Sequence, residues 1–144
     1  HIGDSRCYQF RAGKLTQLSK DHTLVQELID QGRLSAEEAS SHPQKSLITK
    51  ALMGNTETEP FIQLINVEPD DLFLLCTDGL SSVINESEIG KILREDGLTE
   101  IAVEKLKAAV YKSGAPDNIT LVLAKLTSEN LGSIGTIGAA AVVA

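Results

Sequence analysis

Apolar runs separated by short polar breaks organise the first third of the chain. Residues 2–11 and 14–19 have the apolar spacing of strands, and the short turn between them predicts a hairpin. Apolar positions at helical spacing over residues 24–29 predict a helix, with Asp21 as its N-terminal cap and Gly32 at its end.

The pattern changes between residues 35 and 77. Residues 35–38 form a capping-box sequence, which predicts a short second helix that ends before Pro43. Residues 46–53 are apolar and fit either a strand or a loop. Two further strands are predicted over residues 61–67 and 71–77, joined by a short polar turn.

Two helices and a strand are predicted in the next part of the chain. Asn85 is placed to cap a helix that starts directly after it, and residues 99–113 have one apolar face. Residues 119–126 form a continuous apolar strand. No repeat or linker divides residues 1–126, which we therefore interpret as one domain.

Residues 127–144 differ from this domain in composition. From Gly132 onward they are rich in Gly, Ala, Ile and Val and carry no charge, and the stretch is too short to span a bilayer. We expect a disordered tail or the start of an extension or membrane helix, and no membrane segment in residues 1–126. The chain also begins at His1 inside an apparent strand, which suggests an N-terminally incomplete domain.

The order of the predicted elements indicates the fold class. Strands, helices, strands, helices and a last strand follow one another, and the short connections favour antiparallel pairing. The helices must then cover one face of the sheet. We expect an α+β layered sandwich rather than a doubly wound parallel sheet.

Composition narrows the class of protein. The chain has 144 residues, of which 42% are hydrophobic and 3% aromatic, so one domain with an aliphatic core is expected. The formal net charge of −7 argues against binding of nucleic-acid phosphates and suits a protein that binds cations. Cys7 and Cys76 lie in apolar segments and are expected to be reduced core residues, which favours a cytoplasmic location.

Three aspartates stand next to strand-like segments that are far apart in the sequence. Asp78 follows an apolar run and precedes Gly79, which allows a tight turn; Asp4 lies in a Gly-Asp-Ser-Arg sequence, and Asp117 in a Pro-Asp-Asn sequence. An isolated aspartate of this kind usually caps a turn. If the three converge, however, their oxygen-only ligand set selects Mg²⁺ or Mn²⁺ over zinc or copper.

Several short motifs of the chain occur together in a fixed order. They are Gly3-Asp4-Ser5-Arg6, Asp21-His22, His42-Pro43-Gln44, Ile48-Thr49-Lys50-Ala51-Leu52, Thr77-Asp78-Gly79-Leu80 and Asp117-Asn118-Ile119-Thr120. Over roughly residues 1–126 this order resembles the metal-dependent serine/threonine protein phosphatases of type 2C, in their bacterial form.

The resemblance implies a fold and a set of site residues. The implied fold is a four-layer α-β-β-α sandwich of two antiparallel sheets flanked by helices, of which this chain holds the C-terminal half to two-thirds. Asp78 and Asp117 are then ligands of the core metal pair, and Asp4 joins Asp78 at a third, weaker site. Asn118 orients its neighbour, and residues 21–50 correspond to a mobile flap beside the active site.

The resemblance also implies a reaction. Two or three Mn²⁺ or Mg²⁺ ions activate a water that attacks the phosphorus of phosphoserine or phosphothreonine in line, without a covalent phospho-enzyme. The implied partners are phosphoprotein substrates and a cognate serine/threonine kinase, in bacterial signal transduction.

Some features of the family are missing from the chain. It contains neither the N-terminal Arg and acidic pair nor the Asp-Gly-His-Gly motif that bridges both metals. We therefore expect the isolated chain to bind metal weakly and to have little or no activity. Lys50 stands where the bacterial family usually has Arg, and Thr77 where it more often has Ser. Both substitutions keep the positive charge or the hydroxyl group of the usual residue. The alternatives are a catalytically inactive, phosphatase-like regulatory binding module and a plain carboxylate metal-binding domain.

Other polar residues near these motifs have more than one interpretation. His22 is either a polar residue of a capping turn or a residue of the catalytic edge. His42 either packs locally in its loop or acts as a general acid or substrate contact. Arg6 is expected to form an ion pair with Asp4, ahead of binding phosphate, and Asp70-Asp71 is expected to lie in a turn.

Overall fold

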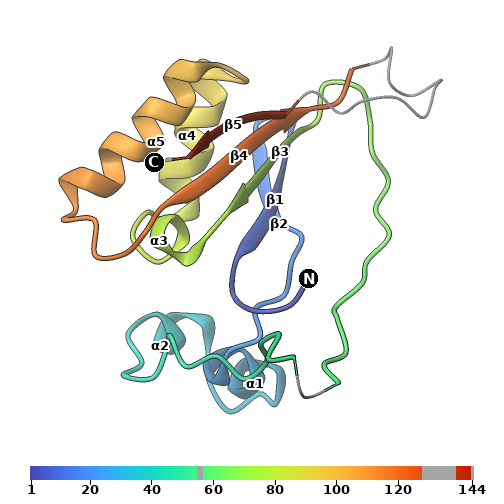
Figure 1. Ribbon diagram of the computed structural model, residues 1–144, viewed down its shortest axis with the longest axis vertical. Coiled ribbons are helices and arrows are strands. Elements are labelled where there is room, and N and C mark those ends of the chain that lie inside the picture. The colour runs from blue at the N-terminus through green and yellow to red at the C-terminus, as the bar shows by residue number, and fades with distance from the viewer. Residues whose placement is uncertain (55–56, 128–138, 144) are drawn as a thin grey trace. The chain divides into compact units, whose positions relative to one another are not determined.

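The computed structural model describes residues 1–54, 57–127 and 139–143, and two compact units are found in it. One unit, here called the small unit, consists of residues 1–5 and 19–63. The other, here called the sheet unit, consists of residues 6–18 and 64–144. The helices α1 and α2 lie in the small unit, and all five strands lie in the sheet unit (Figure 1).

The sheet unit is built on a five-stranded antiparallel sheet in the order β2-β1-β3-β4-β5 (Figure 1). The strands are β1 (Arg6–Arg11), β2 (Lys14–Gln17), β3 (Leu72–Cys76), β4 (Thr120–Lys125) and β5 (Ala139–Val143). Strand β3 occupies the centre, where Leu74 pairs with Tyr8 of β1 and with Leu123 of β4. The predicted hairpin of β1 and β2 and the strands at β3 and β4 are confirmed.

Three helices complete the sheet unit, and α4 and α5 cover one face of its sheet (Figure 1). They are α3 (Asp78–Ser81), α4 (Glu86–Asp96) and α5 (Glu100–Lys112). Their apolar faces meet the sheet in one buried cluster that includes Leu74 and Leu123 from the strands and Ile89 and Leu106 from the helices. Burial of this aliphatic surface is the main stabilising term of the unit. The α+β class is thereby confirmed.

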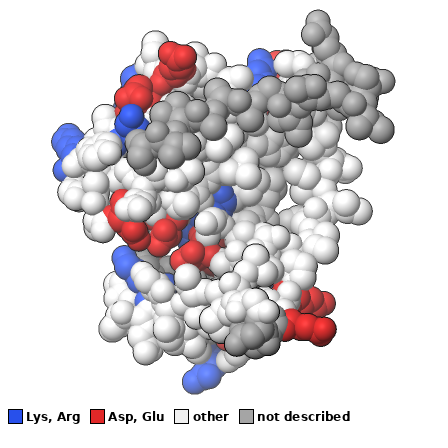
Figure 2. Space-filling model, viewed as in Figure 1, with Lys and Arg blue, Asp and Glu red and all other residues white. Residues whose placement is uncertain are grey.

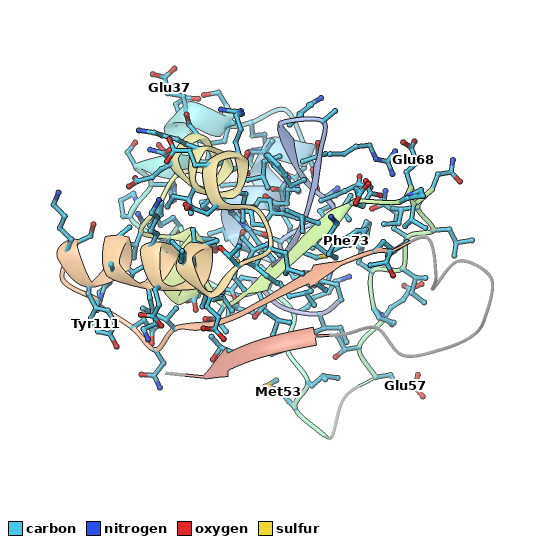
Figure 3. The ribbon with its side chains drawn as sticks, turned by 90° about the horizontal axis from the view of Figure 1, so that it is seen from above. Glu37, Met53, Glu57, Glu68, Phe73 and Tyr111 are labelled. Carbon is cyan, nitrogen blue, oxygen red and sulfur yellow. The ribbon has the colours of Figure 1, made fainter. Side chains whose placement is uncertain are left out.

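The opposite face of this sheet is more open. Leu75 alternates with the buried Leu74 along β3 and is 47% exposed, and Phe73 is half-buried on the same face (Figure 3). The described part of the chain contains one sheet, so the second sheet of the expected sandwich is not among these residues.

Residues 61–67 form no strand, contrary to the prediction. Within the part of the chain that the structure describes, Phe61 is the residue of this segment that pairs backbone to backbone, through two hydrogen bonds with His1 of 2.9 Å each. Further along, Ile62 and Leu64 are 79% and 97% exposed. A strand needs a neighbour to accept and donate its backbone hydrogen bonds. The described residues provide no such neighbour beyond Phe61.

The small unit contains α1 (Leu24–Asp30) and α2 (Ala36–Ser40). The cap of α1 is Thr23, whose hydroxyl accepts a hydrogen bond from Gln26 N, so the prediction of Asp21 as the cap is wrong. The reason is position: the residue directly before the first helical residue can reach the free N–H groups. The capping box of Ser35 at α2 is confirmed.

The apolar segment 46–53 of the small unit is a loop with one strand-like contact. Ile48 forms an isolated antiparallel bridge with Thr23. Beyond it the side chains of Leu52 and Met53 are exposed, and Met53 projects away from the chain (Figure 3). Of the two interpretations that the sequence left open, the loop is therefore the one observed.

Element boundaries differ from the predictions at three further places. Strand β1 begins at Arg6 rather than residue 2, because Gly3 has a φ of +104° and breaks the extended conformation. A single helical turn, α3, follows β3 where only a tight turn was predicted. In the tail, where a disordered segment or the start of an extension or membrane helix was expected, β5 pairs antiparallel with β4. Residues 128–138 and 144 of the tail lie outside the described residues.

On the face that Figure 2 draws, most described atoms belong to uncharged residues, and acidic side chains lie in several separate groups, some of them beside basic ones. The full sequence has more acidic than basic residues, which gives the formal net charge of −7. Within the residues that the structure describes, no helix is both long enough and apolar enough to cross a bilayer.

Candidate metal centre

Asp78 stands at the junction of β3 and α3, at one end of the sheet. Thr77, directly after the strand, is extended, with φ −78° and ψ 168°, and the helix begins at Asp78. Asp78 is half-buried, while the next two residues of α3, Gly79 and Leu80, are buried. The packing of Leu80 into the core therefore fixes the backbone from which the carboxylate projects.

Asp117 lies just before β4, in an exposed turn at the same end of the sheet. Its carboxylate Oδ1 accepts a hydrogen bond of 2.7 Å from the backbone N–H of Asn118. The short local bond holds the side chain against its own turn. Asn118 thus contacts its neighbour through its backbone.

Thr77 joins the two aspartate-bearing segments. Its backbone N–H donates to Thr120 O at 3.0 Å, and its hydroxyl donates to Asn118 O at 3.3 Å. The same hydroxyl accepts from Thr120 N at 3.1 Å. One side chain therefore satisfies backbone groups at the start of β4 and holds the Asp117 turn beside the residue that precedes Asp78.

Gly79 allows the close approach of these two segments. A Cβ atom at this position would overlap the carbonyl oxygen of Asn118 and lie 2.9 Å from its carbonyl carbon. Because both obstructing atoms belong to the backbone, no side-chain rotation could relieve the overlap. The Gly that follows Asp78 is thus required by packing and not by its φ angle.

The ligand chemistry of this site fits a hard cation. Asp78 and Asp117 offer carboxylate oxygens, the ligands that Mn²⁺ and Mg²⁺ accept. Among the residues that the structure describes, no group of three or more His, Cys, Asp or Glu side chains is arranged to hold a metal ion. Within the described residues, the two aspartates alone therefore fall short of a full set of metal ligands.

Asp4 belongs to the small unit, at a sharp bend after Gly3. The left-handed φ of Gly3, +104°, is one that glycine adopts without strain. His22 approaches this bend: its backbone N–H donates to Gly3 O at 2.8 Å, and its ring Nδ1 accepts from Gly3 N at 3.1 Å. The sequence allowed either a turn or a catalytic role for His22, and this contact with Gly3 was not predicted.

The remaining candidates make local contacts. Arg6 donates through Nη1 to the hydroxyl of Tyr8 at 3.1 Å. Burial raises the pKa of Tyr8 to about 12, although the charge and hydrogen bond of Arg6 oppose the rise. His42 Nδ1 accepts from Gln44 N at 3.1 Å, which is the local packing that was one of its two interpretations.

Sequence analysis missed the polar cluster at the other end of β3. Asp71 is 1% exposed and accepts from Arg11 Nε at 2.6 Å, Arg11 Nη2 at 2.5 Å, Gln9 Nε2 at 2.9 Å and Glu68 N at 2.9 Å. The Arg11 hydrogen bonds are the main cause that lowers the pKa of Asp71 to about 2. The alternation of Gln9 and Arg11 along β1 was the available signal, but it needed the pairing of β1 with β3.

Two relatives of known class are similar to this chain in sequence. The serine/threonine protein phosphatase PstP of Mycobacterium tuberculosis is 44% identical over 142 residues, which are 99% of this chain and 27% of that protein. The protein phosphatase PhpP of Streptococcus pneumoniae is 38% identical over 130 residues, which are 90% of this chain and 53% of that protein. The chain therefore spans about half or less of the length of these relatives. No family model matches the chain.

Solved structures show the same similarity in three dimensions. The crystal structure of the Mycobacterium tuberculosis phosphatase PstP/Ppp matches with a TM-score of 0.83 and 44% identity, over 88% of this chain and 53% of that one. The catalytic domain of PstP in complex with two manganese ions matches with a TM-score of 0.75 and 39% identity, over 89% of this chain and 52% of that one.

Proposed function

We propose that this chain is part of a metal-dependent serine/threonine protein phosphatase of type 2C, and that it supplies part of the metal site at which phosphoserine and phosphothreonine in proteins are hydrolysed. One observation carries the proposal most directly: Thr77 joins the segments that bear Asp78 and Asp117 at one end of the sheet. The manganese complex of a similar phosphatase supports the choice of metal.

In this proposal Asp78 and Asp117 hold Mn²⁺ or Mg²⁺, and Asp4 serves as a further ligand. Such ions, when bound, acidify water and stabilise the charge of the transferring phosphoryl group. Other residues of this chain then hold the proposed ligands in place. Thr77 and Gly79 keep the two segments in contact, and the N–H of Asn118 holds the carboxylate of Asp117.

The proposed substrates are phosphoproteins, and the proposed partner is the serine/threonine kinase that phosphorylates them, in the cytoplasm. Two similar proteins are named as serine/threonine protein phosphatase and protein phosphatase, which supports this substrate class. The second candidate function is a phosphatase-like regulatory module without activity. It is favoured by the two-carboxylate site, which falls short of a full set of metal ligands within the described residues.

The test is Mn²⁺-dependent hydrolysis of para-nitrophenyl phosphate and of a phosphothreonine peptide, measured on this chain and on the gene product that contains it. We expect turnover by the gene product that EDTA abolishes and that Asp78→Asn lowers by about 10²–10³-fold. Glu57→Gln is the charge-matched control, because Glu57 is exposed and projects away from the chain (Figure 3).

The outcomes separate the two functions. Turnover that needs Mn²⁺ and is lost in Asp78→Asn and Asp117→Asn, but not in Glu57→Gln, supports the phosphatase. Turnover that survives in both aspartate variants would mean that the metal site is elsewhere. Mn²⁺ binding that these substitutions abolish, without turnover on either substrate, favours the regulatory module.

A further inference from the structure

His22 and Gly3 are joined by a pair of hydrogen bonds that involves a side chain. The backbone N–H of His22 donates to Gly3 O at 2.8 Å, as in a sheet. The return bond runs from Gly3 N to the ring Nδ1 of His22, at 3.1 Å. A histidine ring thus takes the place that a backbone carbonyl would have in a regular strand pair.

This pair lies inside a wider set of backbone bonds in the small unit. On one side Thr49 N donates to His22 O at 2.8 Å. On the other, His1 and Phe61 exchange two backbone hydrogen bonds of 2.9 Å each. Two residues that lead into Asp4, His1 and Gly3, are therefore each held by a pair of hydrogen bonds, and His22 provides the pair at Gly3.

The ring of His22 is itself held in place. It stacks on the ring of His1 with centroids 5.3 Å apart and an interplanar angle of 23°. Because Nδ1 accepts from Gly3, the neutral ring carries its proton on Nε2. Burial, together with the positive charge of Lys50, lowers the pKa of His22 and so favours the neutral ring.

The residue held in this way directly precedes Asp4. Gly3 has a left-handed φ of +104°, and no neighbouring atom lies within 4 Å of where its Cβ would be. Gly3 has no side chain of its own to anchor it, and its two hydrogen bonds with His22 hold its peptide groups. The peptide that follows Gly3 sets the position of the Asp4 backbone, from which the carboxylate projects.

We propose that His22 is a positioning residue for Asp4: its ring Nδ1 fixes the Gly3 amide and thereby aims the Asp4 carboxylate at a divalent cation. The inference rests on the proposed function, in which Asp4 is a metal ligand. In this role His22 acts through the Gly3 backbone. It does not cap α1, which Thr23 does, and it does not touch the reacting groups.

The test uses side chains that differ in where they place an acceptor. In His22→Asn the amide oxygen takes the place of Nδ1, so the bond to Gly3 N is kept. In His22→Gln the amide group reaches the place of Nε2 instead, and His22→Ala has no acceptor. His42→Ala is the matched control, because His42 Nδ1 accepts from Gln44 N in its own loop.

Two quantities are measured by NMR on the gene product that contains these residues. The first is the exchange rate of the Gly3 amide, which we expect to rise about tenfold in His22→Gln and His22→Ala but not in His22→Asn. The second is the Mn²⁺ concentration that broadens the Asp4 amide. We expect it to rise about tenfold in the same two variants, to recover in His22→Asn and to stay unchanged in His42→Ala.

Each outcome bears on the inference. Unchanged Gly3 exchange in His22→Ala would overturn it, and so would faster exchange with an unaltered Mn²⁺ response at Asp4. Broadening at Asp78 and Asp117 but not at Asp4 would overturn it too, while the proposed function stands. Absence of Mn²⁺ broadening at all three aspartates would overturn the proposed function itself.

Discussion

At the scale of single residues, Gly79 is the position where one added methyl group has the largest predictable effect. Its Cβ would meet the backbone of Asn118, which cannot move without disturbing the Thr77 bonds. We expect Gly79→Ala to lower the free energy of unfolding by about 3 kcal/mol and to weaken Mn²⁺ binding. Urea denaturation and Mn²⁺ titration measure the two effects.

Gly90 provides the control for this substitution. It also lies in a helix, but the nearest atom to its added Cβ is Leu15 Cβ at 3.6 Å, an ordinary contact. Gly90→Ala is expected to raise the free energy of unfolding by about 0.5–1 kcal/mol, since alanine is the better helix former. Equal effects at both positions would contradict the role given to the Asn118 backbone.

A second prediction at this scale concerns Asp71 and how the stability of the fold depends on pH. Its pKa falls from 3.8 to about 2, chiefly through Arg11, so the folded protein holds fewer protons than the unfolded chain between these values. The stabilisation is thus complete above about pH 4 and is lost as the pH falls towards 2. Asp71→Asn should cost about 2–4 kcal/mol at pH 6, and less at pH 3, in urea denaturation.

Asp70→Asn is the neighbouring control. Asp70 pairs with Lys125 at 2.7 Å, but its side chain is 80% exposed, and its φ of 72° is one that asparagine tolerates. We expect a change below about 0.5 kcal/mol at both pH values. A pH-independent cost for Asp71→Asn would show that its ionised carboxylate is not what stabilises the fold.

At the scale of elements, the sequence predicted best the features that depend on a few adjacent residues. Ser35 and Asn85 cap their helices as expected, because the cap and the N–H that it accepts lie three residues apart. What the sequence could not supply is which segments meet: the Thr77 contact with Asn118 spans 41 positions.

The wrong strand at residues 61–67 has the same cause. Its apolar pattern is that of a buried strand, yet pairing decides whether a strand forms. We expect the Leu64 amide to exchange with solvent at least about 10³-fold faster than that of Leu74, which lies between two paired strands. Hydrogen exchange followed by NMR compares these two leucines directly. Equal protection would mean that residues 61–67 are paired after all.

At the scale of the whole molecule, net charge affects every measurement of metal binding. The chain carries a formal charge of −7, and its acidic side chains form several groups on the surface (Figure 2). Any divalent cation is attracted to such a protein, whether or not a site exists. Binding that comes from the overall field is screened by salt over about 8–10 Å, whereas coordination by carboxylates in contact with the ion is screened much less.

A salt series therefore separates the two kinds of Mn²⁺ binding. Raising NaCl from about 0.01 M to 1 M, over which the screening length falls from about 30 Å to 3 Å, should remove the diffuse binding and leave a smaller component at the Asp78–Asp117 site. Asp78→Asn should abolish the salt-resistant component, while Glu57→Gln, with the same change of charge, should keep it. If both variants behave alike at high salt, the residual Mn²⁺ is held by charge alone, and the two aspartates do not form a metal site.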